Sequence, residues 1–350
     1  MGYRKLFSYG VPIIVFALVP LFTRSPYYLG IFITTGINVI LAMSFIMMLR
    51  TGLISLAISA FFGLGAYASA LLVTKSGMSF WLSLPASVLM VSVVALIVGA
   101  VCVRNAGFTF LLITMVFGML IPVTLGNISI VGGYSGISPI PPPNPITIPF
   151  LARIVFMSKT PYYYLIMGLV LIVIVAFWAL YSSWLGEAWR AIGLTESLAK
   201  SVGIDVYRHR LLTFVIASGA DALAGAFYAS YVGTVTPIDM GVFKSIYVHI
   251  YAILGGVEFA VLGPMVGSFI MTFVPEFLRI ARDVEPIITG VFMMLLILLL
   301  PRGVLGLMLS TTAAARPSES IAGINRILMQ WLMPKRRHEG GRGAGNQRIE

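Results

Sequence analysis

Apolar stretches long enough to cross a membrane recur along the whole chain, and this feature limits its possible folds most strongly. A helix needs about 20 apolar residues to cross the hydrocarbon core of a bilayer. Ten such stretches are predicted, at residues 6–23, 29–49, 53–74, 80–103, 107–125, 162–182, 211–232, 243–257, 259–278 and 286–300. The pattern predicts an all-α polytopic membrane protein with about ten transmembrane helices, eight to ten being compatible with the sequence, and a transmembrane domain over residues 1–310.

Composition excludes a soluble globular protein. Hydrophobic residues make up 59% of the chain and charged residues only 10%, whereas soluble domains contain about 45–50% apolar and about 25% charged residues. The single cysteine, Cys102, excludes an internal disulfide. The first apolar stretch follows Arg4 and Lys5 like a signal peptide, but it lacks a small-x-small cleavage site. We therefore expect it to be retained as the first span.

The basic residues indicate how the chain is oriented in the membrane. The formal net charge is +11, from 23 Lys and Arg against 12 Asp and Glu. With the N-terminus inside, 16 basic residues fall on the cytoplasmic side and seven outside, and seven of those 16 belong to the tail 311–350. Basic residues beside spans favour the cytoplasmic side. The count predicts cytoplasmic N- and C-termini, and it explains the positive charge without a nucleic-acid partner.

Two long loops and the tail lie between or beyond the spans. The outer loop 126–161 contains Gly132-Gly133 and the proline-rich run 139–143, which predicts a stiff, extended loop. The inner loop 183–210 is polar and compatible with helix. In the tail, apolar residues at helical spacing precede the basic run 335–337, which fits a helix on an anionic leaflet or a disordered segment. Both interpretations of the tail stay open.

The sequence offers little support for an enzyme. It has no Gly-x-x-x-x-Gly-Lys phosphate-binding loop and no His-Glu-x-x-His motif, and its three histidines are scattered. We therefore expect no catalytic residue, no metal site and no cofactor of its own. The run Gly133-Tyr134-Ser135-Gly136 matches the motif of rhomboid intramembrane serine proteases, with His249 in a later span. However, that serine runs into the proline-rich loop, which disfavours a Ser–His pair.

Small residues follow one another at helical spacing within the predicted span 53–74. Ser55, Ser59, Gly63 and Tyr67 form one row, and Gly65 begins a second. Small residues let helix backbones approach closely in lipid. We expect the first row to face another helix or the translocation path, and not lipid.

Two ionisable residues fall in the middle of predicted spans. Asp221 lies in 211–232 and His249 in 243–257. An intramembrane carboxylate is costly and faces a partner or a cavity. Asp221 is therefore compatible with a hydrogen bond between helices, with the wall of a path, or with a proton site. It is also the best candidate for the coupling carboxylate of an ion-coupled secondary transporter.

Residues 52–67, with Phe61 and Phe62 in their centre, resemble a family signature. The run Gly-Leu-Ile-Ser-Leu-Ala-Ile-Ser-Ala-Phe-Phe-Gly-Leu-Gly-Ala-Tyr is similar to that of the Liv-type branched-chain amino acid ABC-transporter permeases of the bacterial inner membrane. Five further stretches agree in order, at 132–143, 190–204, 223–229, 254–267 and 300–307. The resemblance covers residues from about 29 to 308.

The resemblance implies a multi-subunit importer. This chain and a second homologous permease would form the path for branched-chain amino acids, two ATP-binding subunits would drive it, and a periplasmic binding protein would deliver the solute. Urea, amides or another small solute are alternatives. The loop 183–210 would be the ATPase-coupling segment. Its expected contacts are apolar side chains at Ile192 and Leu198, charged side chains at Glu187, Arg190 and Glu196, and a helix end at Gly203.

Overall fold

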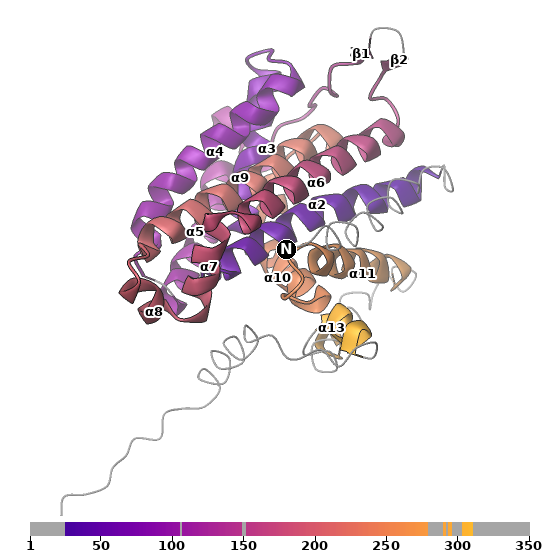
Figure 1. Cartoon of the computed structure of the whole chain (residues 1–350). Coiled ribbons are helices and arrows are strands. Elements are labelled where there is room, and N and C mark those ends of the chain that lie inside the picture. Colours follow the sequence, from indigo (N-terminus) through magenta and orange to yellow (C-terminus); the bar gives the residue numbers. More distant parts are fainter. Residues whose placement is uncertain are drawn as a thin grey trace, which may run out of the picture. The chain divides into compact units, whose positions relative to one another are not determined.

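The computed structural model describes residues 25–105, 107–148, 152–278, 290–291, 293–295 and 303–310 (Figure 1). The predicted first span 6–23, the tail 311–350 and most of the predicted span 286–300 lie outside these residues. The longer helices are α2 (Pro26–Leu49), α3 (Ile58–Thr74), α4 (Phe80–Cys102), α5 (Phe108–Asn127), α6 (Lys159–Ser182), α7 (Trp184–Leu194), α9 (Val206–Val232), α10 (Val242–Gly255) and α11 (Leu262–Leu278). The short ones are η1 (Ser129–Val131), η2 (Gly133–Ser135), α8 (Glu196–Ser201), η3 (Pro237–Met240) and α13 (Gly303–Ser310).

The prediction of an all-α membrane bundle is confirmed. Five described helices are long and apolar enough to cross a membrane, namely α2, α4, α5, α6 and α9. The helices α3 and α10 are apolar but shorter, with 17 and 14 residues. Seven predicted spans therefore coincide with these helices, and the predicted span 259–278 coincides with α11.

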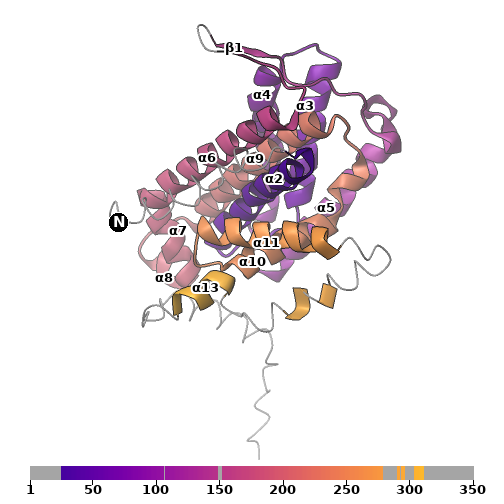
Figure 2. The same cartoon turned by 90° about the vertical axis from the view of Figure 1, so that its right-hand side faces the viewer.

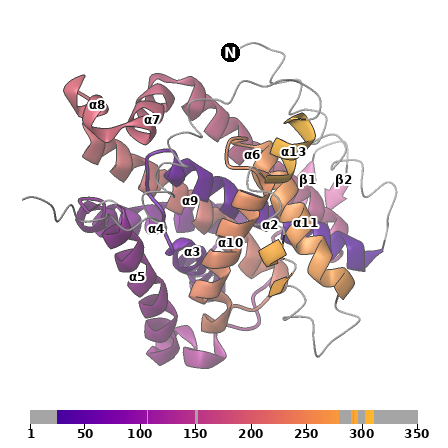
Figure 3. The same ribbon diagram turned by 90° about the horizontal axis from the view of Figure 1, so that it is seen from below.

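Helices α2 and α9 form the centre of the bundle. Most residues of both helices are buried, whereas α4, α5 and α6 expose apolar side chains such as Leu89, Val116 and Ile172. Helix α9 packs on α2, α3 and α4, and α2 also packs on α6, α10 and α11. The view from below in Figure 3 shows α2, α3 and α9 enclosed by the other helices. The exposed apolar faces suit contact with lipid or with another membrane protein.

Helix ends follow local sequence. Pro26 occupies the first turn of α2, where its missing amide costs no hydrogen bond. The carboxylate of Asp205 accepts a hydrogen bond from the backbone N–H of Arg208 (3.1 Å) and so caps the start of α9. That helix ends at Gly233, whose φ of 77° is the left-handed conformation that glycine adopts readily.

The predicted helix 53–74 is wrong at its beginning. Residues 53–57 lie outside α3, although Leu53, Ser55 and Ala57 are all buried. Their amides bond elsewhere: the N–H of Leu56 donates to Oγ1 of Thr114 (3.1 Å), and that of Ala57 donates to Oγ of Ser55 (3.2 Å). Non-helical backbone is tolerated at membrane depth where protein groups satisfy it. Ser55 therefore does not share a helical stripe with Ser59 and Gly63.

The two ends of the bundle carry different structures. At one end, the short strands β1 (Ile146–Ile148) and β2 (Ala152–Ile154) pair antiparallel, a hairpin that the sequence analysis missed. Helices α7 and α8 lie at the opposite end in both Figure 1 and Figure 2. The outer loop is extended after η2, as predicted, and Ile137 pairs with Val235 in an isolated bridge. The loop is therefore fastened to the connection between α9 and α10.

Candidate functional site

Most of the predicted path residues lie on α3, and Asp221 and His249 lie on α9 and α10. A methyl group added to Gly65 would overlap the backbone of Ala222, and one added to Gly225 would overlap the carbonyl oxygen of Phe62. These two glycines therefore let α3 and α9 come into backbone contact. Close contact of this kind is what small residues allow in membrane helices.

Ser59 joins α3 to α10. Its backbone N–H donates to Oγ of Ser245 (2.9 Å), and the Ser245 hydroxyl donates to Oγ of Ser59 (2.9 Å). Gly63 faces the 3-10 turn η3, where an added methyl would overlap the side chain of Met240. Both residues are buried against protein. The expectation that this row does not face lipid agrees with their positions.

The two phenylalanines of the signature point to different surroundings. Phe61 packs against the rings of Phe117 and Phe214, with ring centroids 5.4 Å apart in each case. Phe62 lies beside Tyr228 of α9 and beneath the ammonium group of Lys244. Phe61 is thus a core residue, whereas Phe62 contributes to a charged cluster.

Asp221 is fully buried between α9 and α2. The Ser44 hydroxyl of α2 is hydrogen-bonded to its Oδ1 atom, and its Oδ2 atom has no hydrogen-bond partner among the described residues. Ser44 also lies 2.8 Å from the carbonyl oxygen of Leu41. This hydrogen bond joins two largely buried helices, α2 and α9.

His249 is bound to its own helix. Its Nδ1 atom lies 2.5 Å from the carbonyl oxygen of Ser245, and its ring centroid is 4.0 Å from that of Phe45. Ser135 of the protease-like motif is exposed in η2, and no described hydrogen bond joins it to His249. Within the described ranges, no group of three or more His, Cys, Asp or Glu side chains is arranged to hold a metal ion.

A cluster of charged and aromatic side chains near η3 was missed by the sequence analysis. The Nζ atom of Lys244 lies 3.4 Å from the ring centroid of Phe62 and 4.9 Å from that of Tyr228. Asp239 lies near enough to act on Lys244 electrostatically, and it faces the Tyr228 hydroxyl. The only sign in the sequence was Lys244, at the start of an apolar stretch. The orientation count treated this lysine as one of the seven basic residues outside the membrane.

The loop 183–210 folds into two short helices, α7 and α8. Ile192 of α7, Ala199 of α8 and Val206 of α9 form a small apolar core between them. Gly203 has a φ of 82° and follows the end of α8, as expected for a left-handed helix end. Ile192 is only 3% exposed. It is therefore not available as a direct docking contact, and that part of the prediction is wrong.

The outer surface of α7 and α8 carries other apolar side chains. Leu198 is 64% exposed, and Trp184, Leu194 and Val202 are also exposed. Arg190 pairs with Glu187 on the surface of α7, at an N–O distance of 3.4 Å. Leu198 and Arg190 thus remain available to a partner, and Trp184, Leu194 and Val202 join the candidates.

Arg210 fastens this unit to the bundle. Its guanidinium donates to the carbonyl oxygen of Thr51 (3.0 Å) and to Oε2 of Glu196 (2.9 Å). Glu196 also pairs with Lys200 (2.8 Å). Hydrogen bonds from Lys200 and Arg210, in that order, hold the pKa of the Glu196 carboxyl below its ordinary value. Glu196 therefore holds α8 against Arg210 and is not a free charged contact for a partner.

Arg50 links the end of α2 to α6 and to the loop before α11. Its guanidinium lies 5.0 Å from the ring centroid of Tyr181 and donates to the carbonyl oxygen of Glu258 (3.4 Å). A methyl group on Gly193 of α7 would overlap the carbonyl oxygen of Arg50. The end of α2, the loop before α11 and α7 therefore meet at one place. A displacement of α7 would be transmitted to α2 through this contact.

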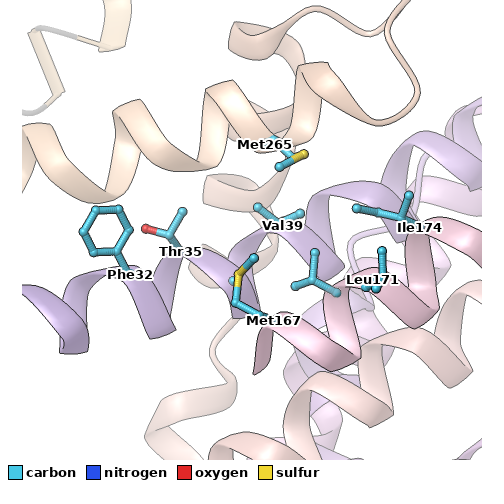
Figure 4. Close-up of a pocket in the computed structure, with 9 residues that line it drawn as sticks. Phe32, Thr35, Val39, Met167, Leu171, Ile174 and Met265 are labelled. Carbon is cyan, nitrogen blue, oxygen red and sulfur yellow. The ribbon is translucent and has the colours of Figure 1, made fainter. Parts of the chain in front are cut away.

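An apolar crevice lies between α2, α6 and α11 (Figure 4). Its lining includes Phe32, Val39, Met167 and Met265, and its free volume is about 20 Å³. A cavity needs roughly 10–15 Å³ to hold one water molecule. The crevice is therefore a packing gap of about one water molecule and is too small for an organic solute.

Comparisons with known proteins show which sequences this chain is similar to. A family model described as "Branched-chain amino acid transport system / permease component" matches residues 27–301. The chain is 27% identical over 295 residues to the high-affinity branched-chain amino acid transport system permease protein LivM of Escherichia coli (strain K12), a match covering 77% of this chain and 66% of that relative. The autoinducer 2 import system permease protein LsrC of Enterobacter sp. (strain 638) is 25% identical over 263 residues, covering 72% and 71%.

These matches cover only part of the relatives' length. The chain spans just under two thirds of the length of its LivM relatives. No solved structure matches it.

Proposed function

Because the chain belongs to the family of permease components of branched-chain amino acid transport systems, we propose that it is one of two permease subunits of an ABC importer for such amino acids. ATP hydrolysis takes place on separate ATPase subunits, and a periplasmic binding protein supplies the solute. The chain itself forms path and coupling surface and catalyses no reaction. It is an integral membrane protein, and the proposal places it in the bacterial inner membrane with both termini cytoplasmic.

The observation that carries the proposal is the braced pair α7–α8. It is a packed unit with its own apolar core, and Arg210 of α9 joins Glu196 of α8 to the carbonyl oxygen of Thr51 at the end of α2. It exposes Leu198 and other apolar side chains at the end of the bundle opposite the hairpin (Figure 2). Exposed apolar side chains on a rigid support suit docking into a groove of a partner. Such a unit transmits a partner's movement into the two central helices.

Docking is tested by charge placed at the exposed position. Leu198→Asp combined with Arg190→Glu is expected to release the ATPase subunits in a pull-down, while the permease remains in the membrane. Ile130→Asp is the matched control, because Ile130 is 71% exposed in η1, far from the inner loop in sequence. The assignment of α7–α8 is refuted by full ATPase recovery with the double variant, or by equal loss with the control.

The solute is tested by uptake in cells. A strain whose only leucine importer contains this chain is expected to take up labelled L-leucine, with competition by isoleucine and valine. Urea and amides, the alternatives within the same transporter class, are expected not to compete. The relative LsrC is named for the import of autoinducer 2, so similarity to this family does not by itself identify the solute. If urea or an amide blocks uptake and branched-chain amino acids do not, then urea or the amide is the solute instead.

A further inference from the structure

The charged and aromatic cluster near η3 has the composition of a ligand site. It joins Phe62 of α3, Tyr228 of α9, Asp239 of η3 and Lys244 of α10, four elements that bring one cation, one anion and two aromatic faces together. The buried Tyr67 hydroxyl of α3 lies near the same carboxylate. None of these residues belongs to the inner coupling unit.

Lys244 is held without an anionic contact. Its ammonium lies on the face of Phe62 at 3.4 Å, where the negative face of the ring attracts a cation. Among the described residues, its side chain forms no hydrogen bond and no ion pair within 4 Å. It stands in the first turn of α10, and the N-cap residue Gly241 provides no side-chain cap. The lysine and the positive end of the helix therefore both favour an anion at this point.

Asp239 is held by hydrogen bonds, and its carboxylate can accept further ones. Its Oδ2 atom accepts hydrogen bonds from the backbone N–H (3.0 Å) and the hydroxyl (2.8 Å) of Thr236. Among the described residues, Oδ1 accepts no hydrogen bond of normal geometry, and Tyr228 lies close enough to interact with the carboxylate. A carboxylate with two oxygens accepts several hydrogen bonds. Asp239 can therefore receive a cationic donor without losing its bond to Thr236.

Tyr67 supplies an independent sign of a missing partner. Its side chain is 2% exposed, and its hydroxyl has no hydrogen-bond partner among the described residues. Buried polar groups are normally hydrogen-bonded, so this hydroxyl is free to bond to a water molecule or to a bound solute. This hydroxyl acts electrostatically with Asp239, which places it on the anionic side of the cluster.

We propose that this cluster binds the zwitterionic head of an α-amino acid on its way through the membrane. Lys244 and the first turn of α10 hold the α-carboxylate, and Asp239 with the Tyr67 and Tyr228 hydroxyls holds the α-ammonium. The inference rests on the proposed import of amino acids and adds to it the residues that recognise the solute.

The two charges of the cluster exclude simpler ligands. Lys244 and Asp239 influence each other electrostatically but form no ion pair within 4 Å, so the two charges do not neutralise each other by direct contact. A lone anion would satisfy the lysine and be repelled by the aspartate, and a lone cation would do the reverse. A zwitterion completes both sides at once and brings no net charge into the membrane.

The surroundings favour an apolar side chain on that zwitterion. Ile238 and Phe243, which flank the charged pair in sequence, are 87% and 76% exposed. No further charged residue lies between Ile238 and Ile253 apart from Asp239, Lys244 and the ionisable His249. Apart from the charged pair, this segment is therefore apolar in sequence, which suits a solute with an aliphatic side chain.

The test measures ligand binding to the assembled transporter, purified as this chain with its second permease and ATPase subunits. The probes are L-leucine, 4-methylpentanoate, which lacks the ammonium, and 3-methylbutylamine, which lacks the carboxylate. Ligand-dependent thermal stabilisation gives an apparent Kd for each. The parent is expected to bind leucine and to bind each single-charge analogue roughly tenfold to hundredfold more weakly, since a lost charged hydrogen bond has that effect.

The variants assign the two halves of the site. Lys244→Met and Asp239→Asn are each expected to weaken leucine binding at least tenfold, and the asparagine still accepts the bonds from Thr236. Lys244→Arg retains the charge and is expected to restore part of the affinity. Lys75→Met is the matched control, because Lys75 is an exposed lysine whose ammonium donates to the carbonyl oxygen of Ile130 (2.5 Å).

The outcomes separate this site from the proposed function. Leucine binding that is unchanged in both Lys244→Met and Asp239→Asn overturns the site. If cells that carry these variants take up leucine as fast as cells that carry the parent, the import proposal stands and the site alone is refuted. A parent that neither imports nor binds leucine refutes the import proposal itself. If Lys244→Met fails to assemble, Asp239→Asn and Tyr67→Phe decide by the same criterion.

Discussion

Arg210→Met is expected to detach the inner unit α7–α8 from the bundle. The substitution removes one hydrogen bond to the buried carbonyl oxygen of Thr51 and one to Glu196, at 3.0 and 2.9 Å. A hydrogen bond from a charged donor contributes about 1.5–3 kcal/mol. The Glu196 side chain is 39% exposed, so its pair with Arg210 contributes no more than about 1 kcal/mol. The local opening free energy of α7–α8 should therefore fall by about 2–4 kcal/mol.

Hydrogen exchange of the α7 and α8 amides measures this change directly. A loss of about 2–4 kcal/mol corresponds to exchange that is faster by roughly 30- to 1,000-fold. Arg208→Met is the matched control, because the Arg208 side chain is 83% exposed and, among the described residues, forms an ion pair only with Asp205 at 2.9 Å. That control should change exchange less than about threefold. Exchange in Arg210→Met that equals the control would refute the view that Arg210 fastens the unit.

Three further perturbations test other parts of the structure. Gly225→Ala should destabilise the bundle by about 1–3 kcal/mol because its methyl overlaps the Phe62 carbonyl oxygen, whereas Gly168→Ala, which meets open space, should be neutral or stabilising; equal melting temperatures would contradict this. Asp221→Asn should keep most ATP-driven uptake, since an amide also bonds to Ser44, and loss of uptake would favour the ion-coupled alternative. Folding lowers the pKa of Glu196 from its ordinary 4.5. Its stabilisation of α8 is therefore complete above pH 4.5 and is lost as the pH falls through the folded pKa. Hydrogen exchange of the α8 amides, corrected for the intrinsic rate, tests this, and a corrected rate that stays constant down to pH 3 would count against it.

Hydropathy was sufficient to predict the main spans, because lipid requires long apolar helices whatever their partners. It was insufficient at residues 53–57, where an extended segment is as apolar as a helix. That segment is specified by the hydroxyl of Thr114, which is remote in sequence and bonds the amide of Leu56. Composition alone contains no sign of such a contact.

The candidate sites show the same division. The inner loop was predicted from polarity and family resemblance, and its helix end at Gly203 agrees with the structure. Ile192 and Leu198 look equivalent in sequence, yet one is buried and the other exposed, because Val206 and Ala199 cover Ile192. Lys244 was counted only as a topology charge. Its position over Phe62 depends on how α10 packs against α3, which no local pattern encodes.

The source of energy tests the central claim most directly. Proteoliposomes would contain this chain, its second permease and the ATPase subunits, with the binding protein outside and labelled L-leucine as solute. The account predicts saturable leucine uptake that requires ATP on the ATPase side and is unaffected by collapse of the pH gradient. Uptake that proceeds without ATP and follows the pH gradient would contradict it.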